Sequence, residues 1–211
     1  MPTHGIMKIV NYWRMATLIK ITGFVLSNLP FWVLEALSII LAEILFIFPN
    51  KRKRVILSNL KYAFPNWSHK KILSVGKESA ARMFEMGLFS LVYPFLSKDA
   101  CRRILLLNER VENQLTELRK TKKPILLLIP HVALFECLAV SPHFKPQGNR
   151  HLGAIYRPHR NYELDQWIKH SREKSGVSVF SRETSIWDAK KFLRQKNWLG
   201  LLFDQNSGIQ G

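Results

Sequence analysis

A histidine and a glutamate lie five positions apart, as His131 and Glu136, in the otherwise apolar stretch "ILLLIPHVALFE" (residues 125–136). Ionisable side chains are costly in apolar surroundings unless they are paired or hydrogen-bonded. On one regular helix this spacing would place the two side chains about 140° apart, so they would not meet. They can meet if His131 lies in a turn after a strand and Glu136 lies in the first turns of the next helix. The carboxylate would then fix the tautomer of the imidazole and leave its other nitrogen free as a base.

Such a pair can deprotonate a hydroxyl group for attack on an acyl group. The sequence has no Gly-x-Ser-x-Gly motif to supply a protein nucleophile, so a hydroxyl on the substrate is the simpler attacker. The structural alternative is a hydrogen-bonded core histidine and a glutamate that points to water. Two ligands make a poor metal site, and the histidines and cysteines form no cluster at metal spacing. We therefore expect neither a metal nor a cofactor.

The elements that would position this pair follow from short apolar runs without strict alternation. Such runs predict strands at residues 124–129, 152–156, 177–180 and 198–203. The stretches "NYELDQWIKHSREKSG" and "SIWDAKKFLRQKN", which separate the last three runs, have helical patterns. Strands that are buried on both faces and alternate with helices imply βαβ units. We predict an α/β fold with a mainly parallel sheet flanked by helices.

Each of the four predicted strands is followed by polar residues. The carboxyl ends of parallel strands lie along one edge of a sheet, and ligands bind there. We therefore expect residues that are far apart in the sequence to converge on one crevice. They are Pro130 and His131 after the first strand, Arg157 to His159 after the second, Ser181 to Glu183 after the third, and Asp204 to Asn206 after the fourth.

The amino-terminal part contains an apolar run, "FWVLEALSIILAEILFIF" (residues 31–48), which only Glu35 and Glu43 interrupt. As a helix it would be about 27 Å long, just short of the roughly 30 Å of a bilayer core. The two glutamates would lie about 80° apart around the helix and share a face. A membrane-anchored helix with this face on protein or water fits the pattern, and a buried helix of a soluble protein is the alternative. We predict an anchoring segment over residues 1–50 and a second domain over residues 51–211.

The charge balance is strongly basic, with 32 Lys and Arg against 15 Asp and Glu, a formal net charge of +17. This surplus favours anionic partners such as phospholipid head groups, phosphorylated substrates, acidic proteins or nucleic acid. The stretch "NKRKR" (residues 50–54) directly follows the apolar run and suits a cytoplasmic membrane surface with anionic lipids. A nucleic-acid-binding protein is an alternative, but the chain has no zinc-finger, RRM or basic heptad pattern. We expect no nucleic-acid partner.

The segment "PHVALFE" resembles the signature of membrane acyltransferases that use acyl thioesters, a histidine and an acidic residue separated by four positions. Three further stretches narrow the resemblance: "RVILSNLKYAFPNWS" (residues 54–68), "IYRP" (155–158) and "LLFDQNSG" (201–208). Together with the apolar amino-terminal segment, they resemble the late acyltransferases of bacterial lipid A biosynthesis over essentially the whole chain. The resemblance implies transfer of a fatty acyl chain from acyl carrier protein, the co-substrate, onto a hydroxyacyl chain of a lipid A precursor.

The resemblance also implies roles for individual residues. His131 would be the general base and Glu136 its orienting partner. Arg157 would stabilise an oxyanion or hold a phosphate. Asp204 matches the acidic residue of the later motif, which either takes part in the chemistry or holds the site together. We expect Asp204, Gln205 and Arg160 to contribute to substrate binding.

The expected partners are acyl carrier protein, a lipid A precursor and an anionic phospholipid membrane. The resemblance places the protein at the bacterial inner membrane with its catalytic domain facing the cytoplasm. The family continues beyond the point that corresponds to Gly211, so we expect the carboxyl-terminal part of the family fold to be missing. An inactive, membrane-anchored, truncated homologue is therefore the alternative to an active acyltransferase.

Overall fold

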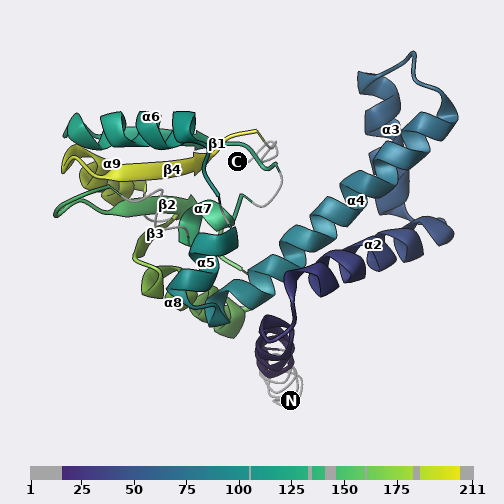
Figure 1. Ribbon diagram of the computed structural model, residues 1–211, viewed down its shortest axis with the longest axis horizontal. Coiled ribbons are helices and arrows are strands. Elements are labelled where there is room, and N and C mark those ends of the chain that lie inside the picture. The colour runs from purple at the N-terminus through teal and green to yellow at the C-terminus, as the bar shows by residue number, and fades with distance from the viewer. Residues whose placement is uncertain are drawn as a thin grey trace, which may run out of the picture.

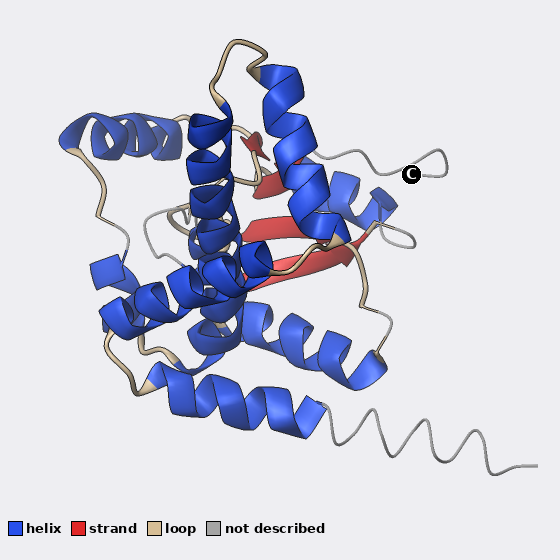
Figure 2. Ribbon diagram, turned by 90° about the vertical axis from the view of Figure 1, so that its right-hand side faces the viewer, coloured by secondary structure: helices blue, strands red, loops and turns tan. Residues whose placement is uncertain are grey.

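The computed structural model describes residues 16–104, 106–132, 135–140, 146–159, 161–182 and 186–204. Figure 1 shows a parallel sheet with its helices at one end of the molecule and a group of long helices that extends away from it. We call residues 16–95 the helical arm. Figure 2, seen from the side of this arm, shows its helices in front of the sheet.

The helical arm consists of a helix over Ala16–Ser27, α2 (Phe31–Ile47), α3 (Lys51–Ala63), α4 (His69–Val92) and the short 3₁₀ helix η1 (Tyr93–Phe95). Side-chain caps fix two of the helix starts, because they satisfy backbone N–H groups that have no partner within the helix. Asn50 accepts a hydrogen bond from the Lys53 N–H at the start of α3, and Ser68 accepts one from the Lys71 N–H at the start of α4.

Helix α2 packs along α4 with one ridge of side chains. The buried members of this ridge follow each other at intervals of four residues, as expected for one face of a helix. They are Leu34, Ser38, Ala42 and Phe46. On the α4 side, Gly76 leaves room for the Phe46 ring, because an added Cβ would lie only 3.2 Å from it.

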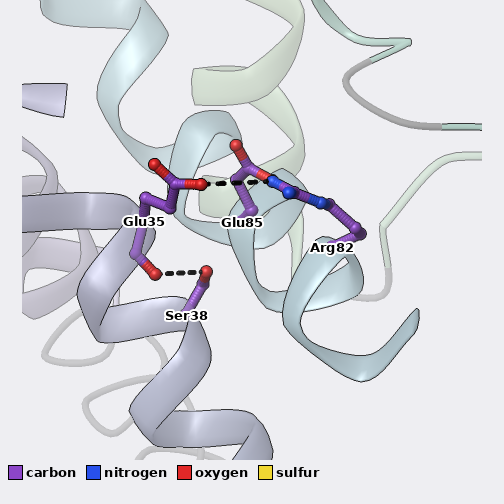
Figure 3. Close-up of polar contacts among 4 residues, drawn as sticks. All are labelled: Glu35, Ser38, Arg82 and Glu85. Carbon is purple, nitrogen blue, oxygen red and sulfur yellow. Dashed lines mark hydrogen bonds and ion pairs between the residues drawn. The ribbon is translucent and has the colours of Figure 1, made fainter. Parts of the chain in front are cut away.

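Both glutamates of the apolar run reach cations of α4. Glu43 Oε2 lies 2.6 Å from Lys77 Nζ, and Glu35 Oε1 lies 3.7 Å from Arg82 Nη1. The Arg82 guanidinium also pairs with Glu85, at 2.7 Å (Figure 3). The two glutamates therefore have a protein partner, which is one of the two surroundings that we expected for them.

No single helix in the described part of the chain is long and apolar enough to cross a bilayer. Helices α2 and α3 reach that length and composition only when they are taken together, and they are bent by 93° relative to each other. The membrane helix predicted from residues 31–48 is therefore not confirmed.

The sheet contains the parallel strands β1 (Ile125–Ile129), β2 (Leu152–Tyr156), β3 (Val177–Ser181) and β4 (Trp198–Leu202) in the order β1-β4-β2-β3. The predicted α/β fold with a parallel sheet and flanking helices is confirmed. The helices of this part are α5 (Lys98–Ile104), α6 (Glu109–Lys120), α7 (Cys137–Val140), α8 (Tyr162–Lys174) and α9 (Ile186–Arg194).

The core of the α/β part lies on both faces of the sheet. On one face Leu115 of α6 packs with Leu152, Val177 and Trp198 at the start of three strands. On the other face the Phe192 ring of α9 lies so close to Gly153 that an added Cβ would be 2.7 Å from it. These contacts hold the strands in register, so that their carboxyl ends form one common edge.

The helical arm joins the α/β part through η1. Phe95 of η1 contacts Trp167 of α8, with ring centroids 6.2 Å apart, and also contacts Phe24 of the Ala16–Ser27 helix at 5.9 Å. A further buried cluster contains Phe89 and Tyr93 of the arm together with Cys101 and Cys137. The arm is thus packed directly against the segment that follows His131.

Candidate active site

The carboxyl ends of the strands border a cleft of about 1040 Å³. Its ionisable lining residues come from four different segments: His131 and Glu136 after β1, Arg157 after β2, Arg172 of α8, and Arg182 after β3. Most of the remaining lining is apolar and includes Leu127, Ile129, Phe135, Leu138, Leu202 and Phe203. The residues predicted to converge at this edge of the sheet do so in part. Among those that the structure describes, Pro130, His131, Arg157 and Arg182 line the cleft, whereas Pro158, His159, Ser181 and Asp204 are not part of its lining.

His131, which lines the cleft, forms a short polar contact with Asp204, the residue two positions after β4. The ring Nδ1 of His131 lies 2.7 Å from Asp204 Oδ1, and the backbone N–H of His131 donates to both carboxylate oxygens, at 3.0 and 2.9 Å. The two residues meet because β1 and β4 are neighbours, with Ile129 opposite Leu202. Each residue lies two positions beyond its strand. A carboxylate on Nδ1 selects the tautomer in which Nε2 is unprotonated and can act as a base.

The electrostatics of this pair also support His131 as a base that Asp204 orients. The hydrogen bond with the His131 ring holds the pKa of the Asp204 carboxyl below its ordinary value. Asp204 is therefore ionised at neutral pH, and it can stabilise an imidazolium that forms during a reaction. The Phe135 ring meets the imidazole edge to face, with centroids 4.9 Å apart, and limits its rotation.

Glu136 has a different partner from the one that its spacing to His131 suggests. Its carboxylate accepts hydrogen bonds from Arg172 Nη2 at 2.9 and 3.2 Å, and no hydrogen bond joins it to His131. Only 15% of the Glu136 side chain and 18% of the Arg172 side chain are exposed. The difference arises because Glu136 faces α8, whereas β4 brings Asp204 to the imidazole.

Two buried groups lie beside this ion pair. Burial raises the pKa of Tyr93 to about 12, and its hydroxyl has no hydrogen-bond partner among the described residues. Burial likewise raises the pKa of the Cys137 thiol to about 12. A protonated, buried thiol is not a nucleophile.

Arg157 is exposed at the edge of the cleft, and the residues around it are braced by Asp165. The buried Asp165 carboxylate accepts a hydrogen bond from the His159 backbone N–H at 2.7 Å and one from the Tyr156 hydroxyl at 3.3 Å. These bonds hold both sides of Arg157. Arg160 and Gln205 lie outside the described residues, so their roles in substrate binding stay predictions.

Two residues of the site escaped the sequence argument: Arg172 and Asp165. Both lie within a predicted helix, where charged residues usually face solvent, and nothing local marks them. Arg182 was predicted at this edge, among the polar residues after the third strand, but the sequence argument gave it no role. Within the described residues, no three His, Cys, Asp or Glu side chains lie close enough to hold a metal ion.

The fold and the site together define an α/β protein with a hydrogen-bonded Asp–His pair at the edge of a parallel sheet, beside a large and mainly apolar cleft. Residues 5–211 match the family model described as bacterial lipid A biosynthesis acyltransferase, and the chain belongs to this family. The family resemblance of its motifs is thus confirmed, and it implies an acyltransferase in lipid A biosynthesis. A comparison with curated proteins gave no match.

Proposed function

We propose that the protein transfers a fatty acyl chain from the thioester of acyl carrier protein to a hydroxyl group of a lipid A precursor. The observation that carries this proposal is the contact of 2.7 Å between His131 Nδ1 and the Asp204 carboxylate at the border of an apolar cleft. A general base must be oriented and unprotonated at the nitrogen that faces the substrate. The Asp204 carboxylate orients the ring and, in the neutral imidazole, holds the proton on Nδ1, so that Nε2 is the unprotonated nitrogen.

The reaction needs no protein nucleophile. His131 Nε2 accepts the proton of the acceptor hydroxyl while the hydroxyl oxygen bonds to the thioester carbonyl carbon. The tetrahedral intermediate then collapses, the carbon–sulfur bond breaks, and the leaving thiolate takes the proton from the imidazolium. Asp204 stabilises the positive charge on the ring between these two steps.

The cleft offers suitable surroundings for the acyl chain. Its volume of about 1040 Å³ lies at the upper end of the range of ligand pockets, roughly 300 to 1,000 Å³. Leucine and isoleucine side chains from β1, β4 and α7 line it, together with Phe135 before α7 and Phe203 after β4. Arg157, at its border, supplies a cation for the oxyanion or for a phosphate of the acceptor.

Glu136 acts in this proposal through the backbone rather than through the imidazole. Its ion pair with Arg172 ties the segment after His131 to α8, at 2.9 Å. A fixed segment keeps His131 in the position that the Asp204 contact requires, because misplacement of a catalytic group by about 1 Å can cost about a hundredfold in rate. The motif glutamate would thus be a positioning residue.

We place the helical arm at the cytoplasmic face of the inner membrane. Its outward side chains include Leu18, Phe24, Trp32, Ile40, Ile47 and Phe48, all exposed in the structure. The basic residues Lys51 to Arg54 begin α3 directly beside Phe48. An exposed apolar surface next to a cluster of cations is typical of proteins that bind anionic bilayers.

The test is an acyl-transfer assay with membranes that carry the protein, labelled acyl carrier protein thioester and a lipid A precursor. We expect the His131→Ala variant to lose about 10²- to 10⁴-fold in rate while it stays bound to the membrane. The control is His170→Ala, since His170 is exposed on α8. Full activity of His131→Ala would refute the mechanism. A folded, membrane-bound wild type that transfers no acyl group would instead support the inactive homologue.

A further inference from the structure

Arg157 and Arg182 follow neighbouring strands and are held side by side. Strands β2 and β3 pair in parallel with Tyr156 opposite Ser181. The Arg182 N–H donates to the Tyr156 carbonyl oxygen at 3.0 Å, so the hydrogen-bond ladder continues one residue beyond β3. Both arginines are exposed and both line the cleft. Their guanidinium groups therefore reach the same border of the cleft from adjacent backbones.

Within the part of the chain that the structure describes, no carboxylate pairs with either of these two arginines. Arg172 also lines the cleft, but its guanidinium is paired with Glu136 at 2.9 Å. Arg157 and Arg182 make no ion pair and no side-chain hydrogen bond within the described part of the chain. Two neighbouring like charges are unfavourable until an anion binds between them.

Two carboxylates of the described residues near this edge of the sheet are already engaged elsewhere. Asp204 is bonded to His131, and Asp165 is bonded to the backbone of His159 and the hydroxyl of Tyr156. The Asp165 contacts hold the His159 backbone and the Tyr156 side chain, on the two sides of Arg157, and Asp165 is only 7% exposed. Because this part of the site is ordered before a ligand arrives, binding would cost little conformational entropy.

We propose that Arg157 and Arg182 form a binding site for a phosphate group of the substrate. Two guanidinium groups can each present two parallel N–H donors to phosphate oxygens. Two adjacent arginines therefore suit a doubly charged phosphate better than they suit a singly charged carboxylate. The inference rests on the proposed function, which brings two phosphates to the cleft. One is the phosphoryl group on the sugar of the glycolipid acceptor, and the other is the phosphodiester in the pantetheine arm of the acyl donor.

Steady-state kinetics of Arg182→Gln with both substrates separate these sources. We expect KM for a phosphorylated glycolipid acceptor to rise about 10- to 100-fold, the effect of one lost charge-assisted hydrogen bond, with kcat nearly unchanged. The enzymatically dephosphorylated acceptor should give the same KM with the variant and with the wild type. Arg182→Lys should restore part of the affinity. Arg194→Gln, an exposed arginine at the end of α9, is the matched control and should behave like the wild type.

The pattern of KM values decides the source of the phosphate. A rise only for the acyl carrier protein thioester would assign the site to the phosphodiester of the donor. Unchanged KM values for both substrates, or an equal rise for the phosphorylated and dephosphorylated acceptors, would overturn the proposal. Circular dichroism of each variant checks that the fold is intact, which we expect because Arg182 is exposed.

A binding measurement keeps this test independent of turnover. Glucosamine 1-phosphate is titrated with the full chain in detergent and followed by phosphorus NMR. We expect line broadening with the wild type and Arg194→Gln, and its loss with Arg182→Gln. Binding that depends on Arg182 in a protein without transfer activity would support the phosphate site and refute the proposed function. If the protein transfers acyl groups but neither its phosphate binding nor its kinetics change in Arg182→Gln, the proposed function would be supported and the phosphate site refuted.

Discussion

The helical arm exposes apolar side chains along its outer side, whereas the α/β part buries them at the start of its strands and exposes several at the cleft, Leu126 and Leu128 among them. In the α/β part, Trp198 and Val177 are almost completely buried, at 0% and 1% exposure. In the arm, Trp32 and Ile47 are 68% and 66% exposed, while Glu35 and Glu43 turn toward α4. Apolar surface of this extent on a soluble protein marks a contact with something else. The comparison teaches that the exposed apolar surface of the arm faces outward, whereas that of β1 lines the cleft.

The ion pairs of the two regions differ in how much of their side chains is exposed to water. The Glu43–Lys77 pair in the arm is about half exposed, at 49% and 36%. The Glu136–Arg172 pair beside the cleft has only 15% and 18% of its side chains exposed. When an ion pair has little contact with water, its two charges attract each other more strongly. Removing one of them then leaves the other charge poorly solvated and without a partner. Charge changes should therefore have large effects beside the cleft and small effects in the arm.

The largest expected effect is that of Asp204→Asn on catalysis. The amide carries no charge and can present an N–H to the imidazole, which favours the wrong tautomer. We expect kcat to fall about 10²- to 10⁴-fold, with membrane association unchanged. Acyl transfer and membrane flotation measure the two properties, and Asp188→Asn on the exposed side of α9 is the control. A rate equal to that of the wild type would mean that another group orients His131.

An intermediate effect is expected for Arg172→Met, measured as the free energy of unfolding. The substitution leaves the Glu136 carboxylate poorly hydrated and without its partner. We expect a loss of about 3 kcal/mol, at the low end for buried ion pairs because some water reaches this one. The matched control is Lys169→Met, which breaks the exposed pair with Glu173 at 3.9 Å on the same helix. It should cost at most about 1 kcal/mol. Urea titrations in detergent measure both, and equal losses would contradict the distinction.

The smallest effect is expected for Glu43→Gln in the arm. The substitution removes the pair with Lys77 but leaves a neutral side chain that can still accept a hydrogen bond. We expect the free energy of unfolding to change by at most about 1 kcal/mol, and binding to anionic vesicles to be kept or strengthened. Thermal melting and vesicle flotation measure these quantities. A loss of unfolding free energy as large as that of Arg172→Met would show that ion pairs stabilise the arm as strongly as they stabilise the site.

Local sequence patterns predicted the four strands to within one residue at each end, and they also predicted the helices that became α8 and α9. The expectation of strands buried on both faces holds for the start of β4, where Trp198 and Leu199 are buried, but not for β1, whose Leu126 and Leu128 are exposed. The same reasoning placed His131, Arg157 and Asp204 at one edge of the sheet, because parallel strands share the direction of their carboxyl ends. It could not predict that β4 lies beside β1, since strand order leaves no local pattern.

The sequence by itself determined the four strands, the helices between the last three of them, and that the polar residues after the strands share one edge. Only the tertiary structure decided which of them meet. His131 bonds to Asp204, 73 positions away, and Glu136 bonds to Arg172, 36 positions away, although His131 and Glu136 are near neighbours in the chain. The physical reason is that hydrogen bonds and ion pairs act over about 3 Å in space. Strand order and helix packing, rather than sequence distance, bring two groups within that range.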